Sequence, residues 1–371
     1  MDFDFSDDDV QLQDAVRRWV GREYTFDARR AIVAQGGFSR ETYGKMVSLG
    51  LSALLLPERL GGMAMGPISA MIVMEELGRG LVMEPLAHAL VTSILLSRYA
   101  SPEVQSRWCS AIASGEALVV LAMQERGSRY TLAPCRTEAR QGGAGWQVSG
   151  VKSLVPAGNA ADAFVVSAVT QQGLGMFLVP RDSSGVSARA YQTQDGSRAA
   201  EIALAAAGAE CLALHGGLPA QGALDHLTAL TCAEGIGVMD ATLATTVEYL
   251  KTRRQFGVDI SSFQVLRHRI ADMKMALELA RSMAYYATLK LDAPQDERTT
   301  AISRAKYQVG VSMRFIGQQA IQLHGGIGMT DEYVVSHQFR RLTQLEMTCG
   351  DSNHHLGIVA SALKESVGVF T

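Results

Sequence analysis

The sequence predicts an α+β protein in which an N-terminal helical domain, a central antiparallel β domain and a C-terminal four-helix bundle follow one another. Three observations support this. Apolar residues recur at helical spacing in the first and last thirds of the chain, and short runs of β-type composition fill the middle. No strand–helix alternation or GxGxxG motif indicates a parallel nucleotide-binding sheet. We place the domains at residues 1–117, 118–218 and 219–371.

Composition excludes several classes of protein. Of the 371 residues, 47% are apolar and 19% charged, as in ordinary globular domains. The net charge of −3 gives no reason to expect nucleic acid or an anionic membrane as a partner. No run approaches the ~20 apolar residues of a membrane span. The acidic start, MDFDFSDDD, has no signal-peptide or transit-peptide pattern, so we expect a cytoplasmic protein.

The cysteine pattern indicates reduced thiols. The five cysteines are scattered, odd in number and never arranged as CxxC. This spacing favours neither a disulfide framework nor a zinc site, and we expect no bound metal.

The first domain is predicted to be helical. Ser6 is placed to cap a helix whose first turn is acidic, and Val16 and Trp19 fall on one apolar face of that helix. Glu75 and Glu76 follow on a later helix. Adjacent helical residues point about 100° apart, so we interpret this pair as solvated or capping carboxylates.

The middle of the chain is predicted to contain six short strands, separated by turn clusters such as QGGAG and PAGN. Several short strands at close spacing predict a compact antiparallel sandwich or barrel. The predicted strands are Leu118–Met123, Pro134–Ala139, Trp146–Lys152, Ala163–Val169, Gly175–Pro180 and Glu201–Ala205.

The last domain is predicted to contain four long helices, which favours an antiparallel bundle. They cover Ala223–Arg254, a run from Phe263, Thr299–His324 and a run from Ser352 to the C-terminus. The second has a continuous apolar seam. Its members are Leu266, Ile270, Met273, Leu277 and Ala280.

Two segments of this domain carry residue types that bind phosphate. In KTRRQFG, Arg253 and Arg254 precede an aromatic residue and a glycine, and an arginine fork can hold a phosphate through two hydrogen bonds. In QLHGGIGM, Gly325, Gly326 and Gly328 let backbone N–H groups approach phosphate oxygens. Taken alone, each segment is more typical of an exposed helix end or a helix stop than of a phosphate site.

In this order and spacing, these motifs resemble the C-terminal signature of the acyl-CoA dehydrogenase family of flavoproteins. RRQFG with a later FQ, QLHGGIGMTDEY and FRRLTQLEMTCGDS carry the resemblance. GLSALLLPERLGG and EELGRG extend it to the first third, and LAMQERGS and GVKSLVP extend it to the middle. The resemblance implies a three-domain subunit, FAD at a subunit interface, an acyl-CoA thioester as substrate and an electron-transfer flavoprotein as electron acceptor.

The resemblance also assigns FAD contacts to residues of the last domain. Arg253 matches an arginine that reaches the FAD pyrophosphate across the interface, and Asp351 and Asn353 match positions near the adenosine end. The other matched contacts are Phe256, Gln264, Gln322, Gly325 and Gly326.

The catalytic base departs from the family pattern. The family's reaction removes a proton from the carbon next to the thioester, which a carboxylate in an apolar pocket can accept. The usual base is a Glu directly before a Gly, and Cys349 stands at that position. A second subgroup places its Glu on the first bundle helix, where the match is Leu227, with Asp225 and His226 nearby. We name Asp351, two residues after Cys349, as the candidate base.

Other groups near Cys349 leave alternatives open. Glu346 is a second carboxylate. A thiol accepts a proton only when its pKa is lowered, so we interpret Cys349 as a small buried side chain. His354 and His355 face different ways at a helix start, which favours pocket or capping roles over catalysis.

The flavin-ring surroundings are altered too. Leu154 and Pro156 occupy positions where the family offers an aromatic and a hydroxyl, and Gln124 replaces a common Thr. GDSNHHL and VKSLVP resemble small subunits of pimeloyl-CoA dehydrogenase-type two-component enzymes, whose large subunit brings the base. Three functions stay open: a dehydrogenase subunit of a homo- or hetero-oligomer, a non-catalytic subunit completing a partner's flavin site, or an oxygen-using oxidase.

Overall fold

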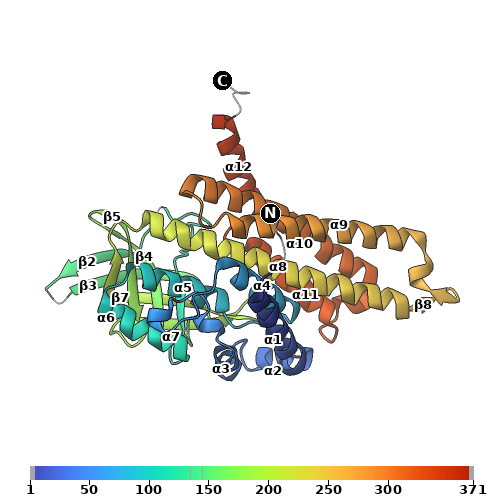
Figure 1. The fold of residues 1–371 in the computed structure, drawn as a ribbon, viewed down its shortest axis with the longest axis horizontal. Coiled ribbons are helices and arrows are strands. Elements are labelled where there is room, and N and C mark those ends of the chain that lie inside the picture. The colour runs from blue at the N-terminus through green and yellow to red at the C-terminus, as the bar shows by residue number, and fades with distance from the viewer. Residues whose placement is uncertain (1–4, 134, 144, 367–371) are drawn as a thin grey trace. The chain divides into compact units, whose positions relative to one another are not determined.

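The structure, a computed structural model, describes residues 5–133, 135–143 and 145–366 (Figure 1). The chain divides into two compact units. Unit 1 contains the described parts of residues 1–29, 71–82 and 228–371, and unit 2 contains those of residues 30–70 and 83–227. The three-domain boundaries expected from the sequence stay a prediction.

Helices dominate both ends of the chain, as predicted. The N-terminal helices are α1 (Asp7–Glu23), α2 (Phe26–Ala34), α3 (Arg40–Ser48), α4 (Pro67–Arg79), α5 (Leu86–Tyr99), α6 (Pro102–Val104) and α7 (Ser110–Ser114). The C-terminal helices are α8 (Gly217–Thr252), α9 (Gln264–Leu289), α10 (Gln295–His324), α11 (Val334–Met347) and α12 (Ser352–Ser366). The sequence prediction omitted α11.

The core of unit 1 lies between its long helices. Met273, Leu277 and Ala280 of α9 are fully buried, and Leu266 and Ile270 pack against the same core. The predicted apolar seam is therefore confirmed. At the N-terminus, Ser6 caps α1, since its side chain accepts a hydrogen bond from the Asp9 N–H, and Val16 and Trp19 are buried as predicted.

Helix α4 contacts α8 closely because glycine occupies the crossing. A Cβ added at Gly237 would lie 1.8 Å from the Glu75 carbonyl oxygen, and one at Gly78 would lie 2.2 Å from the Glu234 carbonyl oxygen. The glycines thus permit backbone contact that any larger residue would prevent.

Glu75 and Glu76 are buried in unit 1, so the interpretation as solvated or capping carboxylates is wrong. Glu76 is 1% exposed and pairs with Arg17 of α1 at 2.7 Å. Glu75 is 5% exposed and pairs with Arg79 at 3.2 Å and with Arg281 of α9. Arginines from distant segments thus compensate the cost of removing both carboxylates from water.

Helix α8 has the length and composition of a membrane span. Alone among the helices of the described ranges, it contains an 18-residue window of mean hydropathy 1.2 with few charges. Yet 83% of that window is buried inside the protein, as in a core helix.

Unit 2 is built on a seven-stranded sheet. The strands are β1 (Val119–Ala122), β2 (Glu138–Gly142), β3 (Gly145–Pro156), β4 (Ala163–Thr170), β5 (Gly173–Pro180), β6 (Val186–Gln192) and β7 (Arg198–Ala213). Their order is β1-β4-β2-β3-β7-β5, β6 pairs with β7, and β4 also pairs with β5. These pairings close a ring of strands. Most are antiparallel, but β1 and β2 each pair with β4 in parallel.

Candidate functional site

The turn between α11 and α12 carries Cys349, which the sequence resemblance matches to the base of the acyl-CoA dehydrogenase family. Cys349 and Gly350 both have left-handed backbones, with φ of +59° and +118°. Lys306 of α10 is fully buried, and its ammonium donates to the carbonyls of Leu345 (2.7 Å) and Glu346 (2.8 Å). A cation at the last carbonyls of a helix is favourable, so α10 fixes where α11 ends.

The carboxylates beside this turn are already engaged. Glu346 accepts hydrogen bonds from the Ser352 N–H (2.9 Å) and hydroxyl (2.7 Å). Asp351 accepts from the His354 N–H at 2.8 Å, which caps the start of α12. Asp351 is half-buried. Both carboxylates thus stabilise the turn and the helix start.

His355 holds the turn from the other side. Its Nε2 lies 3.1 Å from the Cys349 carbonyl oxygen and its Nδ1 lies 3.1 Å from the Ser303 hydroxyl. A carbonyl only accepts, so Nε2 donates and Nδ1 accepts. Burial lowers the pKa of His355 to about 3, which keeps the ring neutral. His355 therefore has a structural role, in line with the capping and pocket roles predicted.

Cys349 is not poised to accept a proton. The residue is half-buried, and burial of its sulfur raises the pKa of the thiol to about 11, outweighing the opposing effects of Lys306 and a Thr228 hydrogen bond. The thiol is therefore protonated at neutral pH, and only a thiolate could act as a base.

The alternative base position on α8 also lacks a carboxylate. Leu227 is 4% exposed. Its buried neighbour Asp225 accepts a hydrogen bond from Gln221 at 2.9 Å, and His226 Nδ1 lies 2.8 Å from the Gly222 carbonyl oxygen. Both neighbours have local partners on their own helix.

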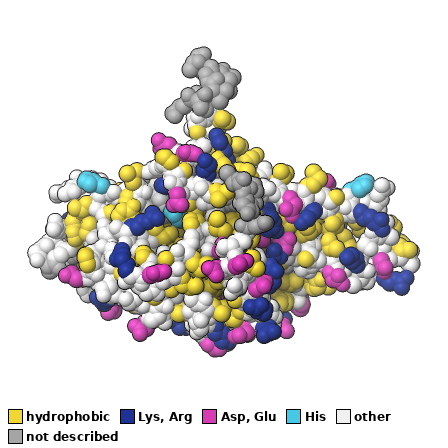
Figure 2. Space-filling view, viewed as in Figure 1, with side chains coloured by type: hydrophobic (Ala, Val, Ile, Leu, Met, Phe, Trp, Pro, Cys, Tyr) yellow, Lys and Arg dark blue, Asp and Glu magenta, His cyan; other side chains and the backbone are white. Residues whose placement is uncertain are grey.

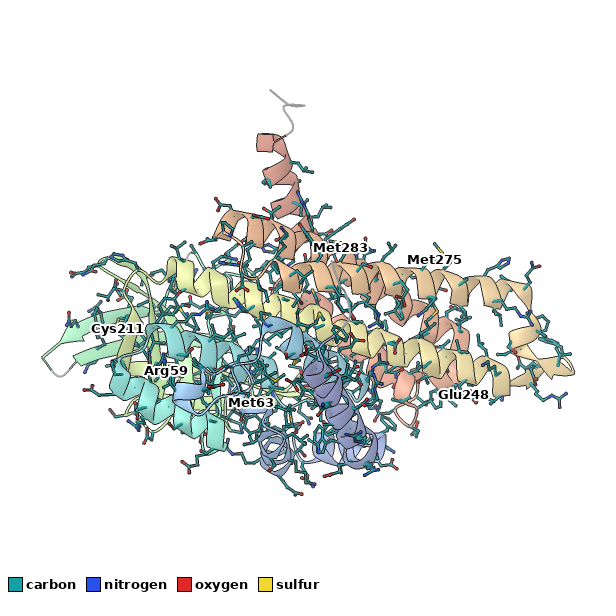
Figure 3. The ribbon with its side chains drawn as sticks, viewed as in Figure 1. Arg59, Met63, Cys211, Glu248, Met275 and Met283 are labelled. Atoms are coloured by element: carbon teal, nitrogen blue, oxygen red, sulfur yellow. The ribbon has the colours of Figure 1, made fainter. Side chains whose placement is uncertain are left out.

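The RRQFG segment forms a hairpin of strands β8 (Arg254–Gln255) and β9 (Val258–Asp259). Phe256 at its tip is 88% exposed with φ of +55°, and its ring meets Phe263 edge-on at 6.1 Å. The ring is therefore accessible to a group outside this chain. Figure 3 labels Glu248 on α8 near the same end.

The Gly-rich turn lies beside this hairpin. Tyr249 of α8 stacks on His324 at 4.4 Å and bonds to its carbonyl at 3.3 Å, and the Arg253 N–H donates to the Tyr249 carbonyl. A Cβ added at Gly325 or Gly326 would meet no atom within 4 Å. The exposed backbone therefore has room for a ligand to lie against it.

This end of unit 1 carries exposed basic side chains that suit the phosphates of FAD, and Arg254 lies 3.5 Å from the Asp259 carboxylate. Figure 2 shows lysine and arginine side chains here, and the exposed ones are Lys251, Arg253, Arg254 and Arg267. Arg253 and Arg254 offer guanidinium groups and the Gly-rich turn offers open backbone, the donors that bind a pyrophosphate. The residues present therefore match the chemistry of a dinucleotide.

The structure separates the predicted FAD residues into two groups. Gln264 begins α9 next to the hairpin, and Gln322 lies in the last turn of α10. Asn353 is exposed in the first turn of α12, and His355 of the same turn contacts Ser303 of α10. Ser303 precedes Gln322 on α10 by roughly 28 Å of helix rise. Figure 1 shows β8 well away from α12.

The predicted flavin-ring residues meet on one part of the sheet in unit 2. The Ser153 N–H donates to the Gln124 carbonyl at 2.9 Å, and the next residue, Leu154, is 44% exposed. Pro156 ends β3 and is half-buried.

Sequence reasoning missed a buried ion pair behind these residues. Lys152 is 0% exposed and its ammonium lies 2.7 Å from Glu125. Burial alone would raise the pKa of Glu125, but hydrogen bonds from Lys152, Thr137 and the Arg136 backbone lower it to about 2. The motifs LAMQERGS and GVKSLVP contain this Glu and Lys. Across the described ranges, no group of three or more His, Cys, Asp or Glu is arranged to hold a metal ion.

Three family models match the chain in succession. The acyl-CoA dehydrogenase N-terminal, middle and C-terminal domains match residues 6–116, 120–205 and 214–364. Among curated proteins, the chain is 27% identical to acyl-CoA dehydrogenase FadE27 of Mycobacterium tuberculosis, covering 89% of each. It is 28% identical to a short-chain specific mitochondrial enzyme of Bos taurus, covering 87% of this chain and 82% of that one.

Solved structures show the same similarity. A glutaryl-coenzyme A dehydrogenase in complex with glutaryl-CoA matches with a TM-score of 0.92 and 26% identity, covering 100% of this chain and 97% of that one. The ChsE4-ChsE5 complex of Mycobacterium tuberculosis matches with a TM-score of 0.91 and 26% identity, covering 99% and 100%.

Proposed function

Because this chain belongs to the acyl-CoA dehydrogenase family of FAD-dependent oxidoreductases, we propose that it acts as one subunit of an oligomeric acyl-CoA dehydrogenase whose proton-abstracting carboxylate comes from a second chain. The reaction is α,β-dehydrogenation of an acyl-CoA thioester. This chain completes the flavin site, and its partner is a related chain that carries Glu before the matching glycine.

The state of Cys349 is the observation that carries this proposal. Its thiol stands where the family's base stands, with a pKa of about 11. The adjacent Glu346 and Asp351 carboxylates accept hydrogen bonds that hold the turn and α12. Proton abstraction by this chain alone therefore lacks a ready acceptor.

The spacing of the FAD residues supports a shared site. Arg253 and Phe256 lie at one end of unit 1, and Asn353 lies on the first turn of α12, roughly 28 Å of α10 rise away. In the proposed assembly, two chains meet so that the hairpin end of one chain lies near the α12 end of its partner. Each chain then supplies one group of contacts.

The chain's own residues have separate tasks in this site. Arg253 neutralises the pyrophosphate, and Gly325 and Gly326 let the backbone approach it. Phe256 covers the cofactor from the hairpin tip. When bound, FAD supplies the hydride acceptor, and we expect electrons to leave to an electron-transfer flavoprotein.

A second candidate is autonomous catalysis with Asp351 as base. One observation favours it: Asp351 is half-buried and lies two residues from Cys349. To accept a substrate proton, this carboxylate would have to give up its bond to the His354 N–H. Asp351→Asn tests this candidate, because an amide oxygen can still cap the helix but cannot take the proton.

The deciding experiment uses the purified chain loaded with FAD, a panel of acyl-CoA thioesters and no oxygen. We expect the flavin absorbance to persist with the chain alone, and to bleach once a Glu-bearing partner chain is added. Bleaching by the chain alone would contradict the proposal, and its loss in Asp351→Asn with FAD still bound would establish the second candidate.

A further inference from the structure

Strand β3 contains a β-bulge beside the predicted flavin-ring residues. Lys152 pairs with Ile202 of β7, and Val155 pairs with Ala200, so two residues of β3 oppose a single residue of β7. A bulge of this kind bends the strand and re-aims a side chain, and bulges are frequent next to active sites.

The bulge turns Leu154 outward. Lys152 and Val155 on either side are 0% and 1% exposed, whereas Leu154 is 44% exposed. Its φ is +54°, in the left-handed region that a bulky side chain rarely adopts. An apolar residue held in this conformation, with its side chain in solvent, needs a local restraint.

Tyr191 provides that restraint. The bulge removes the Leu154 N–H from the ladder with β7, and this N–H donates instead to the Tyr191 hydroxyl at 3.0 Å. Tyr191 lies on β6, where it pairs with Ala199 of β7. The hydroxyl therefore reaches the bulge from a strand whose register is fixed by β7.

The residue opposite the bulge is held as well. Glu201 forms ion pairs with Arg126 at 2.7 Å and with Arg189 at 3.2 Å. Arg189 precedes Tyr191 by two residues on β6, so both side chains lie on one face of that strand. The bulge is thus held by the hydrogen bond from Tyr191 of β6, and the residue opposite it is held by the two ion pairs of Glu201.

We propose that Tyr191 is a positioning residue of the flavin site, which holds the Leu154 bulge so that the Leu154 side chain packs against the flavin ring. This inference rests on the proposed function, because the family resemblance places Leu154 at the ring. Tyr191 acts through Leu154 and does not touch the reacting atoms.

Two readouts on Tyr191→Phe test the proposal, with Tyr99→Phe as the matched control. Tyr99 is an exposed tyrosine of α5 in the same unit. In the apo-protein labelled with ¹⁵N-leucine, we expect Tyr191→Phe to speed hydrogen exchange of the Leu154 amide by roughly three- to tenfold, as the loss of one hydrogen bond allows. In the holoprotein, we expect bound FAD to show shifted visible absorption and circular dichroism bands.

A rescue variant separates positioning from general damage. Asn tolerates the left-handed conformation, so in protein labelled with ¹⁵N-asparagine, Leu154→Asn in the Tyr191→Phe background should return the protection of the residue 154 amide against exchange toward the wild-type level. The flavin bands should stay shifted, because the apolar contact is gone.

The proposal is overturned if Tyr191→Phe leaves the amide exchange at the wild-type rate. It is also overturned if exchange accelerates while the flavin bands match those of Tyr99→Phe, since the bulge would then have no link to the ring. A wild-type chain that takes up no FAD, alone or with a partner, would instead refute the proposed function, and the exchange measurement would still decide whether Tyr191 holds the bulge.

Discussion

His355 donates a hydrogen bond to the Cys349 carbonyl across 3.1 Å, so α12 holds the backbone of the turn that the sequence resemblance matches to the family's base. Lys306 holds the end of α11 just before the same turn. The backbone geometry of this site is therefore fixed by groups other than the residue at position 349. A change of that side chain alone should leave the turn in place.

Cys349→Glu should therefore create a base. The new carboxylate would extend from a turn that is already pinned, and a positioned general base contributes about 10² to 10⁴ in rate. We expect the variant loaded with FAD to bleach with acyl-CoA in the absence of oxygen, at least about 10²-fold faster than the wild type. Cys349→Gln is the control of similar size. An inactive glutamate variant that still binds FAD would show that more than the base is missing.

Lys152→Met should strongly destabilise the protein. The substitution leaves the Glu125 carboxylate buried without its cation, which typically costs about 3–5 kcal/mol. Urea unfolding monitored by circular dichroism measures the loss. The double variant Lys152→Met, Glu125→Gln should recover part of it, because no uncompensated charge remains. A single variant within about 1 kcal/mol of the wild type would contradict this account.

Acid should weaken the fold as the pH falls from about 6.5 toward 4. Burial lowers the pKa of His88 to about 4, and its Nδ1 has no hydrogen-bond partner. Between about pH 6.5 and pH 4, the imidazole is protonated in the unfolded chain but stays neutral in the native protein. The free energy of unfolding therefore falls as the pH falls. For pKa values of 6.5 and about 4, the loss from this residue is on the order of 3 kcal/mol.

His88→Phe should remove that part of the acid sensitivity, because it deletes the titrating group without breaking a hydrogen bond of Nδ1. Urea midpoints measured from pH 7 to pH 4 should fall less steeply in the variant than in the wild type. Parallel curves would exclude His88 as the source.

Gly326→Ala should separate FAD binding from folding. An added Cβ meets no atom of this chain within 4 Å, so we expect the free energy of unfolding to change by less than about 1 kcal/mol. If the cofactor lies against this backbone, FAD affinity should fall by about tenfold or more, as measured by flavin fluorescence titration of the assembled protein. Gly143→Ala, at another glycine with open surroundings, is the control. Equal FAD affinity in both variants would place the cofactor elsewhere.

Local patterns predicted much of the fold. The Ser6 cap, the α9 seam and most strands follow from spacing alone. Strand β6 was missed because its sequence, VSARAYQ, has few large apolar residues to mark a buried face. Helix α11 was missed although it is amphipathic, since its sequence was interpreted only as a motif. Strand β2, EARQG, is largely exposed and begins four residues after the predicted start.

The candidate site was only partly predictable. Motifs predicted the FAD residues and drew attention to Cys349, because those features depend on residue type and order, and the FAD assignments stay a prediction. The hydrogen bonds that hold the turn could not be predicted, because their donors, Lys306 and His355, lie on two separate helices. The burial of Glu76 depends in the same way on Arg17, far away in sequence.

The most direct test of the central claim is anaerobic reduction of bound FAD by acyl-CoA, measured on this chain alone and on this chain with a related chain that carries Glu before the matching glycine. We expect persistent absorbance of oxidised flavin in the first case and rapid bleaching in the second. Bleaching at the same rate in both cases would contradict this expectation.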